Sequence, residues 1–379
     1  MKDGYKKTDL GWIPEEWDLV KLRDIVDICY GKSQKEVEDE NGKYKILGTG
    51  GIIGYTNEYL WSEPSVLIGR KGTIDRPQYI EEPFWTVDTL FYTKLRNNNL
   101  AKWLFYYLNY IDLKKYNEAT GVPSLSVSNL NLISIFRPQL KDQEKIAEIL
   151  STVDSQIDVT DKLIEKTKEL KKGLMQRLLT KGIGHTEFKK TEVGEIPVKW
   201  EVKKLEDVCE FLDGMRKPIK ASDRENMKGS IPYYGASGII DWVNDYIFDD
   251  EIILLGEDGE NIKSRNVPLA FKVIGKCWVN NHAHVLKAKG SNNSDFITYL
   301  LENKNYSSYV IGSAQPKLNQ AQCRRLMLQV PSIDEQNKIA EILLAVDYNI
   351  KEYENKKIKL EELKKGLMQQ LLTGKIRVV

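Results

Sequence analysis

Two long stretches of the chain carry apolar residues at alternating steps of three and four. They cover residues 142–180 and 335–373 and align without a gap at an offset of 193. Both are free of proline and rich in Glu, Lys and Leu, a composition that favours helix, and the steps form a heptad stripe. The stripes consist of Ile146, Leu150, Val153, Ile157, Ile164, Leu174 and Leu178, and of Ile339, Leu343, Val346, Ile350, Leu360, Leu367 and Leu371, with Thr160, Thr167, Lys171 and Lys364 as polar interruptions.

Neither stripe can be buried within a small domain. A helix over residues 142–180, at ~1.5 Å per residue, is about 58 Å long. Each helix therefore needs a long partner, and the pattern predicts that the two pair with each other. Gly173 and Gly366, near the helix ends, mark either a close helix crossing or frayed ends, since glycine costs about 1 kcal/mol against alanine within a helix.

The helix repeat is part of a larger duplication. Segments upstream of each helix match in pairs, and their offset grows from 183 through 187 to 193. The chain therefore consists of two copies of one unit, roughly residues 3–180 and 186–373, and the second copy is ten residues longer (193 − 183). The matching pairs are 5–22 with 188–205, 46–54 with 233–241, 66–72 with 253–259, 84–94 with 277–287, and 121–125 with 314–318.

Each copy is predicted to form a globular head followed by its long helix. Short apolar runs bounded by turns predict strands, and proline with acidic residues marks the start of each long helix. The head elements predicted most clearly are strands at 65–69, 251–256 and 282–287, helices at 100–116 and 294–310, and short strands that end at Pro138 and Pro331.

The predicted fold class is α+β, with two globular α/β heads, two long helices that form an antiparallel coiled coil, and a pseudo-twofold internal repeat. Antiparallel pairing is favoured because the loop from Thr180 to about Trp200 lets the second head fold back, which puts a head at each end. Parallel pairing would need a linker as long as the helices. The predicted domains are 1–140 (first head), 141–182 (first helix), 183–333 (second head) and 334–379 (second helix and C-terminal tail).

Composition indicates a soluble globular protein, with 29% charged residues. No run of about 18 apolar residues occurs, so no membrane span is expected, and the first residues lack an apolar signal segment, which predicts a cytoplasmic protein. The four cysteines form no CxxC pair and are read as free thiols. Net charge is +1, and residues 1–140 carry 18 basic and 19 acidic side chains. Binding to nucleic acid would therefore have to rest on clustered charge.

Motifs for catalysis are missing. The GKS at Gly31 lacks the upstream glycine of a phosphate-binding loop, and GTGGIIG from Gly48 does not fit GxGxxG. No GxSxG, HExxH or Asn-Pro-Pro-Tyr stretch occurs. His282 and His284 would share one face of a strand, but no further metal ligand stands nearby. The sequence therefore predicts a non-catalytic protein with no metal site and no cofactor of its own.

With these features the chain resembles the specificity subunit of a type I restriction–modification system. The resemblance covers essentially the whole chain. It rests on the repeated G-x-I-P-x-x-W segment, the GRKG and GEDG strand ends, WVNNHAHV, and the helix strings KIAEIL and LKKGLMQ, each present twice. It implies that each head is a target-recognition domain for double-stranded DNA and that the helices are spacers on which two modification (methylase) subunits dock. By this resemblance S-adenosylmethionine belongs to the modification subunits, and ATP and cleavage to the restriction subunits.

The candidate DNA contacts lie in turns where glycine allows a ligand to approach the backbone closely. Arg and Lys can bond guanine or phosphate, Asn and Gln can bond adenine, and an acid can accept from cytosine. The alternative for each residue is a solvated surface group or, for 280–282, a hydrogen-bonded strand end, and Trp85 and Trp278 are expected in the core. The candidates are Lys45, Thr49, Arg70, Lys71, Thr73, Arg76 and Ser124 in the first head, and Arg216, Lys217, Lys220, Glu257, Asp258, Asn261, Lys263, Asn280, Asn281, His282, Gln315, Lys317 and Asn319 in the second.

Two other functions are compatible with the sequence. A scaffold with two protein-binding heads on a coiled coil would suit the near-neutral charge, whereas polar loops that differ between the heads favour an asymmetric, two-part DNA target. An enzyme with an unrecognised site would need shared catalytic groups. His282 aligns with Thr89 and His284 with Phe91, so the best candidates are not shared.

Overall fold

The computed structural model describes residues 4–311 and 316–378, which form two compact units. Of these residues, the first unit contains 4–161 and 355–378, and the second contains 162–311 and 316–354. Two long helices, α3 (Leu140–Lys181) and α9 (Ile333–Leu371), each contribute to both units. None of the helices in the described ranges is long and apolar enough to cross a membrane.

Within each unit α3 and α9 run antiparallel, as the short loop between the two copies predicts. Ion pairs join the two helices, and as the residue number of the α3 partner increases, the residue number of the α9 partner decreases. Only antiparallel helices allow this order. The first unit has Asp154–Lys364 (2.6 Å) and Asp161–Lys357 (2.8 Å), and the second has Lys168–Glu354 (3.1 Å) and Lys171–Asp347 (2.6 Å).

The polar interruptions of the heptad stripe are satisfied in two ways. Thr160 and Thr167 each donate a hydrogen bond to the carbonyl oxygen four residues earlier in α3, at 2.7 Å, as helical threonines often do. Lys171 and Lys364, which are equivalent at the offset of 193, instead reach the carboxylates of Asp347 and Asp154 on the other helix. Both kinds of interruption are therefore compatible with a continuous helix pair.

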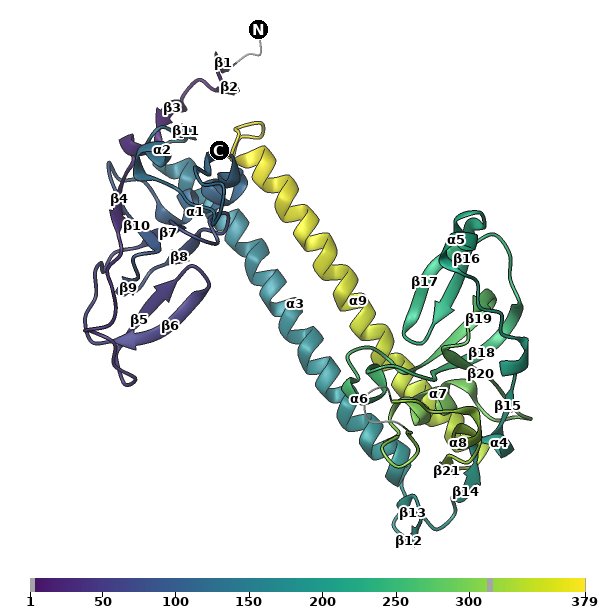
Figure 1. Cartoon of the computed structure of the whole chain (residues 1–379). Coiled ribbons are helices and arrows are strands. Elements are labelled where there is room, and N and C mark those ends of the chain that lie inside the picture. Colours follow the sequence, from purple (N-terminus) through teal and green to yellow (C-terminus); the bar gives the residue numbers. More distant parts are fainter. Residues whose placement is uncertain (1–3, 312–315, 379) are drawn as a thin grey trace. The chain divides into compact units, whose positions relative to one another are not determined.

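The first head is built from small, mostly antiparallel sheets and short helices (Figure 1), and β5 and β9 are the strands that pair parallel. Its main sheet has the order β4-β10-β7-β8, and a second sheet has the order β6-β5-β9. Its elements are β1 (Tyr5–Thr8), β2 (Gly11–Pro14), β3 (Asp18–Lys21), η1 (Leu22–Asp24), β4 (Val26–Tyr30), β5 (Tyr44–Gly48), β6 (Gly51–Thr56), β7 (Ser65–Gly69), β8 (Gln78–Ile80), β9 (Phe84–Thr86), β10 (Leu90–Leu95), α1 (Ala101–Tyr110), η2 (Leu113–Tyr116), α2 (Val127–Asn131) and β11 (Ser134–Arg137).

The second head repeats this plan with one continuous sheet, of order β15-β20-β18-β19-β16-β17. Its elements are β12 (Phe188–Thr191), β13 (Gly194–Pro197), β14 (Glu201–Lys204), α4 (Leu205–Val208), β15 (Cys209–Phe211), η3 (Asp213–Met215), α5 (Ala221–Glu225), β16 (Lys228–Gly235), β17 (Gly238–Val243), β18 (Phe248–Gly256), α6 (Asn261–Ser264), β19 (Ala270–Val279), β20 (Ala283–Ala288), α7 (Ser294–Glu302), α8 (Gln320–Arg324) and β21 (Met327–Val330).

One long strand accounts for the difference between the two sheets. β19 pairs with β18 along its length and also with β16, so it joins both halves of the sheet. In the first head the corresponding stretch is divided into β8 and β9, with Pro83 between them. Proline lacks the N–H that a strand needs for its ladder, which explains why the strand is interrupted there.

The predicted strands and helices are largely confirmed. β7, β18 and β20 lie where the apolar runs predict them, and β11 and β21 end next to Pro138 and Pro331. The head helices are shorter than predicted. α1 ends at Tyr110, and α7 ends at Glu302 because the chain turns to bury Tyr306, which donates to the Leu301 carbonyl at 2.8 Å.

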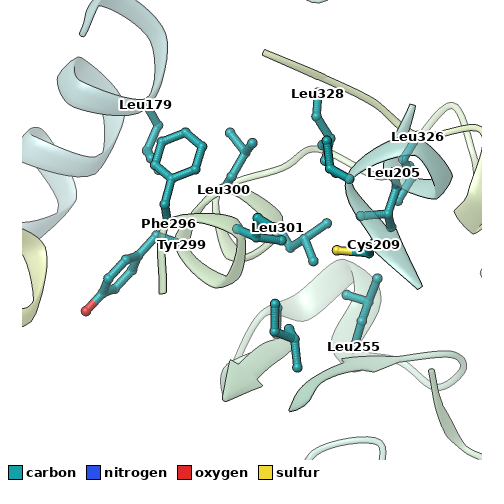
Figure 2. Close-up of a cluster of buried hydrophobic side chains, with 14 of the residues drawn as sticks. Leu179, Leu205, Cys209, Leu255, Phe296, Tyr299, Leu300, Leu301, Leu326 and Leu328 are labelled. Carbon is teal, nitrogen blue, oxygen red and sulfur yellow. The ribbon is translucent and has the colours of Figure 1, made fainter. Parts of the chain in front are cut away.

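Each head core includes the start of one long helix and the end of the other. In the second unit Leu179 of α3 packs beside Phe296 of α7 in a cluster that also holds Leu343 of α9 (Figure 2). In the first unit the core combines Leu150 of α3 with Leu372, just after α9. Burial of these apolar side chains, worth roughly 1.5–3 kcal/mol each, therefore holds each head to both helices.

A buried glutamine fixes each long helix to its head. Gln143 accepts from the amide of Leu100 at 2.8 Å and donates to the Pro138 carbonyl at 2.9 Å. Gln336 repeats both contacts with Asn293 at 3.0 Å and Pro331 at 3.1 Å. Since both residues are 2% exposed, the bonds are shielded from water, and each long helix is attached to its head by the same pair of contacts.

Gly173 and Gly366 lie inside the helices and do not mark a close crossing. A Cβ at either position would meet no heavy atom within 4 Å, and both are exposed. We therefore expect Gly173→Ala and Gly366→Ala each to raise the free energy of unfolding by about 1 kcal/mol, a rise in Tm of about 2–4 °C, measured by calorimetry on the isolated chain.

The matched control is Gly182→Ala. Gly182 has φ +64°, and its Cβ would lie 2.4 Å from Glu335 Oε1, so this substitution is expected to lower the Tm. If all three substitutions changed the Tm equally, the space around each glycine would not be what decides the effect.

Candidate nucleic-acid interface

Two loops meet at the end of β7 in the first head. Lys71 forms an isolated bridge with Ser124, and the Leu125 amide donates to the Arg70 carbonyl at 2.9 Å. Thr49, in the turn between β5 and β6, lies beside them: its Oγ1 is 4.0 Å from the Cβ position of Gly72. We call Thr49, Arg70, Lys71, Thr73 and Ser124 the first loop cluster. The structure thus brings together five residues that the sequence predicts as DNA contacts.

Glycine permits this arrangement at two positions. A Cβ on Gly69 would lie 2.0 Å from the Thr73 carbonyl oxygen, and Gly72 has φ +89°. The first would produce a backbone clash, and the second is a conformation that other residues rarely adopt. The tight turn between them presents Lys71 to solvent.

The cations of this cluster are held differently. Arg70 donates to the Asp88 carbonyl at 3.1 Å and lies 5.3 Å from the centre of the Tyr30 ring, so its guanidinium is oriented by the protein. Lys71 is exposed and pairs with no carboxylate among the described residues. Both side chains can still bind a phosphate or a base edge. The Arg70 guanidinium would do so from a fixed position, whereas the Lys71 ammonium can reach a larger volume.

Lys45 and Arg76 lie outside the first loop cluster. Lys45 is on β5 and forms an ion pair with Glu82 at 2.5 Å, and the hydrogen bond that its ammonium donates to Glu82 raises the pKa of Lys45. Arg76 is exposed, two residues beyond the turn that the cluster uses. The sequence could not separate them from the cluster because all of them follow glycine-rich turns.

The second head joins the equivalent loops. Asp258 forms an isolated bridge with Lys317, at positions that match Lys71 and Ser124, and the Leu318 amide donates to the Glu257 carbonyl at 2.7 Å. His282 Nδ1 lies 2.9 Å from Asp258 Oδ2. We call Asp258, His282 and Lys317 the second loop cluster. It occupies the same place as the first but carries a different set of charges.

Glu257 belongs to a buried network beneath the second loop cluster. Its side chain is 8% exposed and pairs with Arg216 at 2.7 Å and Lys317 at 3.3 Å. Arg216 also donates to the Ala283 carbonyl at 2.8 Å. The sequence placed Glu257 and Arg216 among the DNA contacts, but their polar atoms are occupied within the protein, because the two residues, 41 positions apart, meet under the loop.

His284 is the centre of the same network. Its Nδ1 lies 2.7 Å from Asp213 Oδ2 and its Nε2 lies 2.7 Å from the Leu318 carbonyl oxygen. Each ring nitrogen therefore faces an oxygen atom, a carboxylate on one side and a backbone carbonyl on the other. Burial alone would raise the pKa of Asp213, but hydrogen bonds and charge from His284, the Val285 amide and Arg216 outweigh it, and the pKa is lowered.

The two histidines do not form a shared site. His282 precedes β20 and is exposed, whereas His284 is fully buried in that strand. Among residues 4–311 and 316–378 there is no group of three or more His, Cys, Asp or Glu side chains that could hold a metal ion.

Several other candidates in the second head build the loops. Asn261 uses both ends of its amide on the backbone of Val267, Asn280 is buried and accepts from the His282 amide, and Asn319 caps α8 through the Gln322 amide. Gln315 lies outside the described residues. Those that remain exposed are Lys217, Lys220, Lys263 and Asn281.

Lys32 and Lys35 were missed by the sequence reasoning. The GKSQK segment was compared only with a phosphate-binding loop, yet it occupies the place of Arg216–Lys220 in the second head. Trp85 Nε1 donates to the Lys32 carbonyl at 2.9 Å, and Trp278 Nε1 donates to the Lys217 carbonyl at 2.6 Å. A shared K-x-x-K spacing, 32–35 and 217–220, is the signal that could have revealed it.

Similar proteins share this duplicated plan. The family model described as the type I restriction modification DNA specificity domain matches residues 14–169 and 197–362. The MjaVIII specificity subunit of a type I restriction enzyme from Methanocaldococcus jannaschii is 28% identical, over 97% of this chain and 94% of its own length. The MjaX specificity subunit, described as putative and from the same organism, is 26% identical over 100% and 97%.

A solved structure shows the same fold. The S subunit of a type I restriction–modification system from M. genitalium superposes with a TM-score of 0.66 at 17% identity, and the match covers 94% of this chain and 96% of that one. Since the family model matches each of the two copies and most of the chain, the protein belongs to the family of type I restriction modification DNA specificity domains.

Proposed function

We propose that this chain is the DNA sequence-recognition subunit of a type I restriction–modification complex and that each head reads one half of an asymmetric, two-part target. The observation that carries this proposal is the pair of loop clusters. They occupy equivalent places in the two heads, and the backbones that hold them are repeated, but the side chains that they present differ.

The chemistry of the clusters suits base recognition. Arg70 and Lys71 supply donors that match guanine or phosphate, whereas Asp258, His282 and Lys317 offer both an acceptor and donors in the second head. Because the two sets differ, the two half-sites should differ as well. A scaffold with two protein-binding heads is less favoured, since family membership and the polar, unlike loops both support recognition of DNA.

The helix pair is proposed to dock two modification subunits. Leu170 and Leu363, equivalent at the offset of 193, are 54% and 50% exposed. An exposed apolar residue repeated at equivalent positions fits a partner that is present in two copies. In this assembly the modification subunits bind S-adenosylmethionine, restriction subunits bring ATP-driven cleavage, and the chain itself is not an enzyme. We place the complex in the cytoplasm.

Lys71→Ala tests the first loop cluster. Removal of one exposed ammonium should weaken DNA binding of the assembled complex several-fold at moderate salt, and leave the Tm unchanged, because Lys71 pairs with no described carboxylate. Titrations of labelled duplex over a series of KCl concentrations measure the effect.

Lys7→Ala is the matched control, since Lys7 is exposed on β1 of the same head. Affinity that is unchanged in Lys71→Ala across the salt series would remove this residue from the interface.

A second test concerns the helix pair. Insertion of four residues in α3 and four in α9, at facing positions near Asp161 and Lys357, lengthens the pair by ~6 Å. The unread gap in the methylated target should widen by one or two base pairs, as adenine methylation mapped in cells carrying the variant would show. A target with the original gap would contradict the proposal that the helices set the spacing.

A further inference from the structure

Each head carries two lysines three positions apart, directly beside its loop cluster. In the first head Lys32 and Lys35 follow β4, and in the second Lys217 and Lys220 follow β15 and η3. All four are exposed. We infer that each pair binds the sugar–phosphate backbone of DNA irrespective of sequence, an inference that rests on the proposed function.

A tryptophan holds the first lysine of each pair in the same place. Trp85 and Trp278, equivalent at the offset of 193, each donate their indole N–H to the carbonyl of that lysine. They are 7% and 8% exposed. Lys32 and Lys217 are 185 positions apart, whereas Trp85 and Trp278 are 193 positions apart. The difference arises because the second head has extra residues between its lysine and its tryptophan. The buried indoles therefore preserve the position of the lysine across a change in loop length.

The backbone around Lys32 packs closely against the segment that follows Trp85. The Lys32 amide donates to the Thr86 carbonyl at 2.9 Å, and a Cβ at Gly31 would lie 2.1 Å from the Val87 carbonyl oxygen. After the first lysine, one helical turn begins in both heads: the Glu38 amide bonds to the Gln34 carbonyl, and Lys220 is the N-cap of α5. The second lysine is thus attached to an ordered turn.

The lysine pairs border the loop clusters. Arg70 of the first loop cluster stacks on Tyr30, two residues before Lys32. In the second head Arg216, directly before Lys217, contacts Glu257, directly before Asp258. A duplex that reaches either loop cluster would therefore pass the neighbouring lysines.

None of the four lysines forms an ion pair with a carboxylate of the described residues. Other lysines of the heads do so, such as Lys45 with Glu82 and Lys114 with Asp75. Four unpaired ammonium groups on ordered backbone are available to a polyanion, and no protein contact would have to be broken for them to bind it.

Which residues are the same in the two heads, and which differ, indicates the part of DNA that each set would bind. Where the loops read bases, the heads differ in charge, since Lys71 corresponds to Asp258. At the lysine pairs the charges are the same although the surrounding loop differs. The bases of two unlike half-sites are different, but their phosphates are identical, so a group that is kept in both heads matches the part of DNA that is common to both.

The experiment compares the double variants Lys32→Ala/Lys35→Ala and Lys217→Ala/Lys220→Ala in the complex with modification subunits. Binding is measured from 50 to 300 mM KCl with a duplex that carries the methylated motif mapped in the host and with a duplex that lacks it. Each double variant should lower the slope of log K against log salt by about 1.8, from ~0.9 per phosphate contact. Affinity should fall by the same factor for both duplexes, leaving their ratio unchanged.

The control is Lys7→Ala/Lys190→Ala, which removes exposed lysines that are also equivalent in the two heads but lie on the N-terminal hairpins. It should leave the slope unchanged, and Lys32→Arg/Lys35→Arg should preserve wild-type binding. A slope equal to wild type, the same slope change in the control, or a changed preference between the duplexes would each overturn the inference. Wild-type complex that fails to prefer the motif would instead refute the proposed function.

Discussion

The structure depends on one polar link that occurs in both units. Asp154 of α3 accepts from Tyr106 of the first head at 2.7 Å and pairs with Lys364 of α9 at 2.6 Å. Asp347, Tyr299 and Lys171 repeat it in the second unit at 2.6 Å for both contacts. Burial, with the adjacent carboxylate, raises the pKa of both tyrosines, so their hydroxyls remain donors. Each carboxylate thus joins a head, its own helix and the other helix.

This link specifies register more than it adds stability. The ion pairs are partly exposed, with side-chain exposures of 26–36%, and such pairs contribute little after screening. A shift of one helix by a heptad would break both carboxylate–lysine pairs and leave Asp347 opposite an apolar residue of α3, Ile164 or Leu178. Polar groups at stripe positions select one alignment in coiled coils generally. In this protein Asp154 and Asp347 each select the alignment of α3 with α9, so both heads contact the helix pair in equivalent ways.

Sequence reasoning succeeded where a pattern is local. Heptad spacing predicted α3 and α9, the short loop between the copies predicted their antiparallel pairing, and apolar runs predicted β7, β18 and β20, because period and turn residues determine these elements. It failed where the cause is a contact between distant residues. Lys171 and Lys364 looked like defects because their partners are on the other helix. Glu257 looked like an exposed turn residue, although Arg216 and Lys317 enclose its carboxylate beneath the loop.

The same reasoning explains which functional residues a sequence can reveal. Gly69 and Gly72 shape a turn whose exposure follows from its local backbone, so the exposure of Lys71 was predictable. The proximity of Ser124 and the place of Lys32 were not, because they depend on distant residues, such as Trp85, which is 53 positions from Lys32. The phosphate contact inferred for Lys32 rests on its comparison with Lys217. Internal duplication offers a comparison within one chain. Under the proposed function, residues that both heads keep at the surface would serve what is common to both half-sites or both partner copies, and residues that differ would serve the asymmetry of the target.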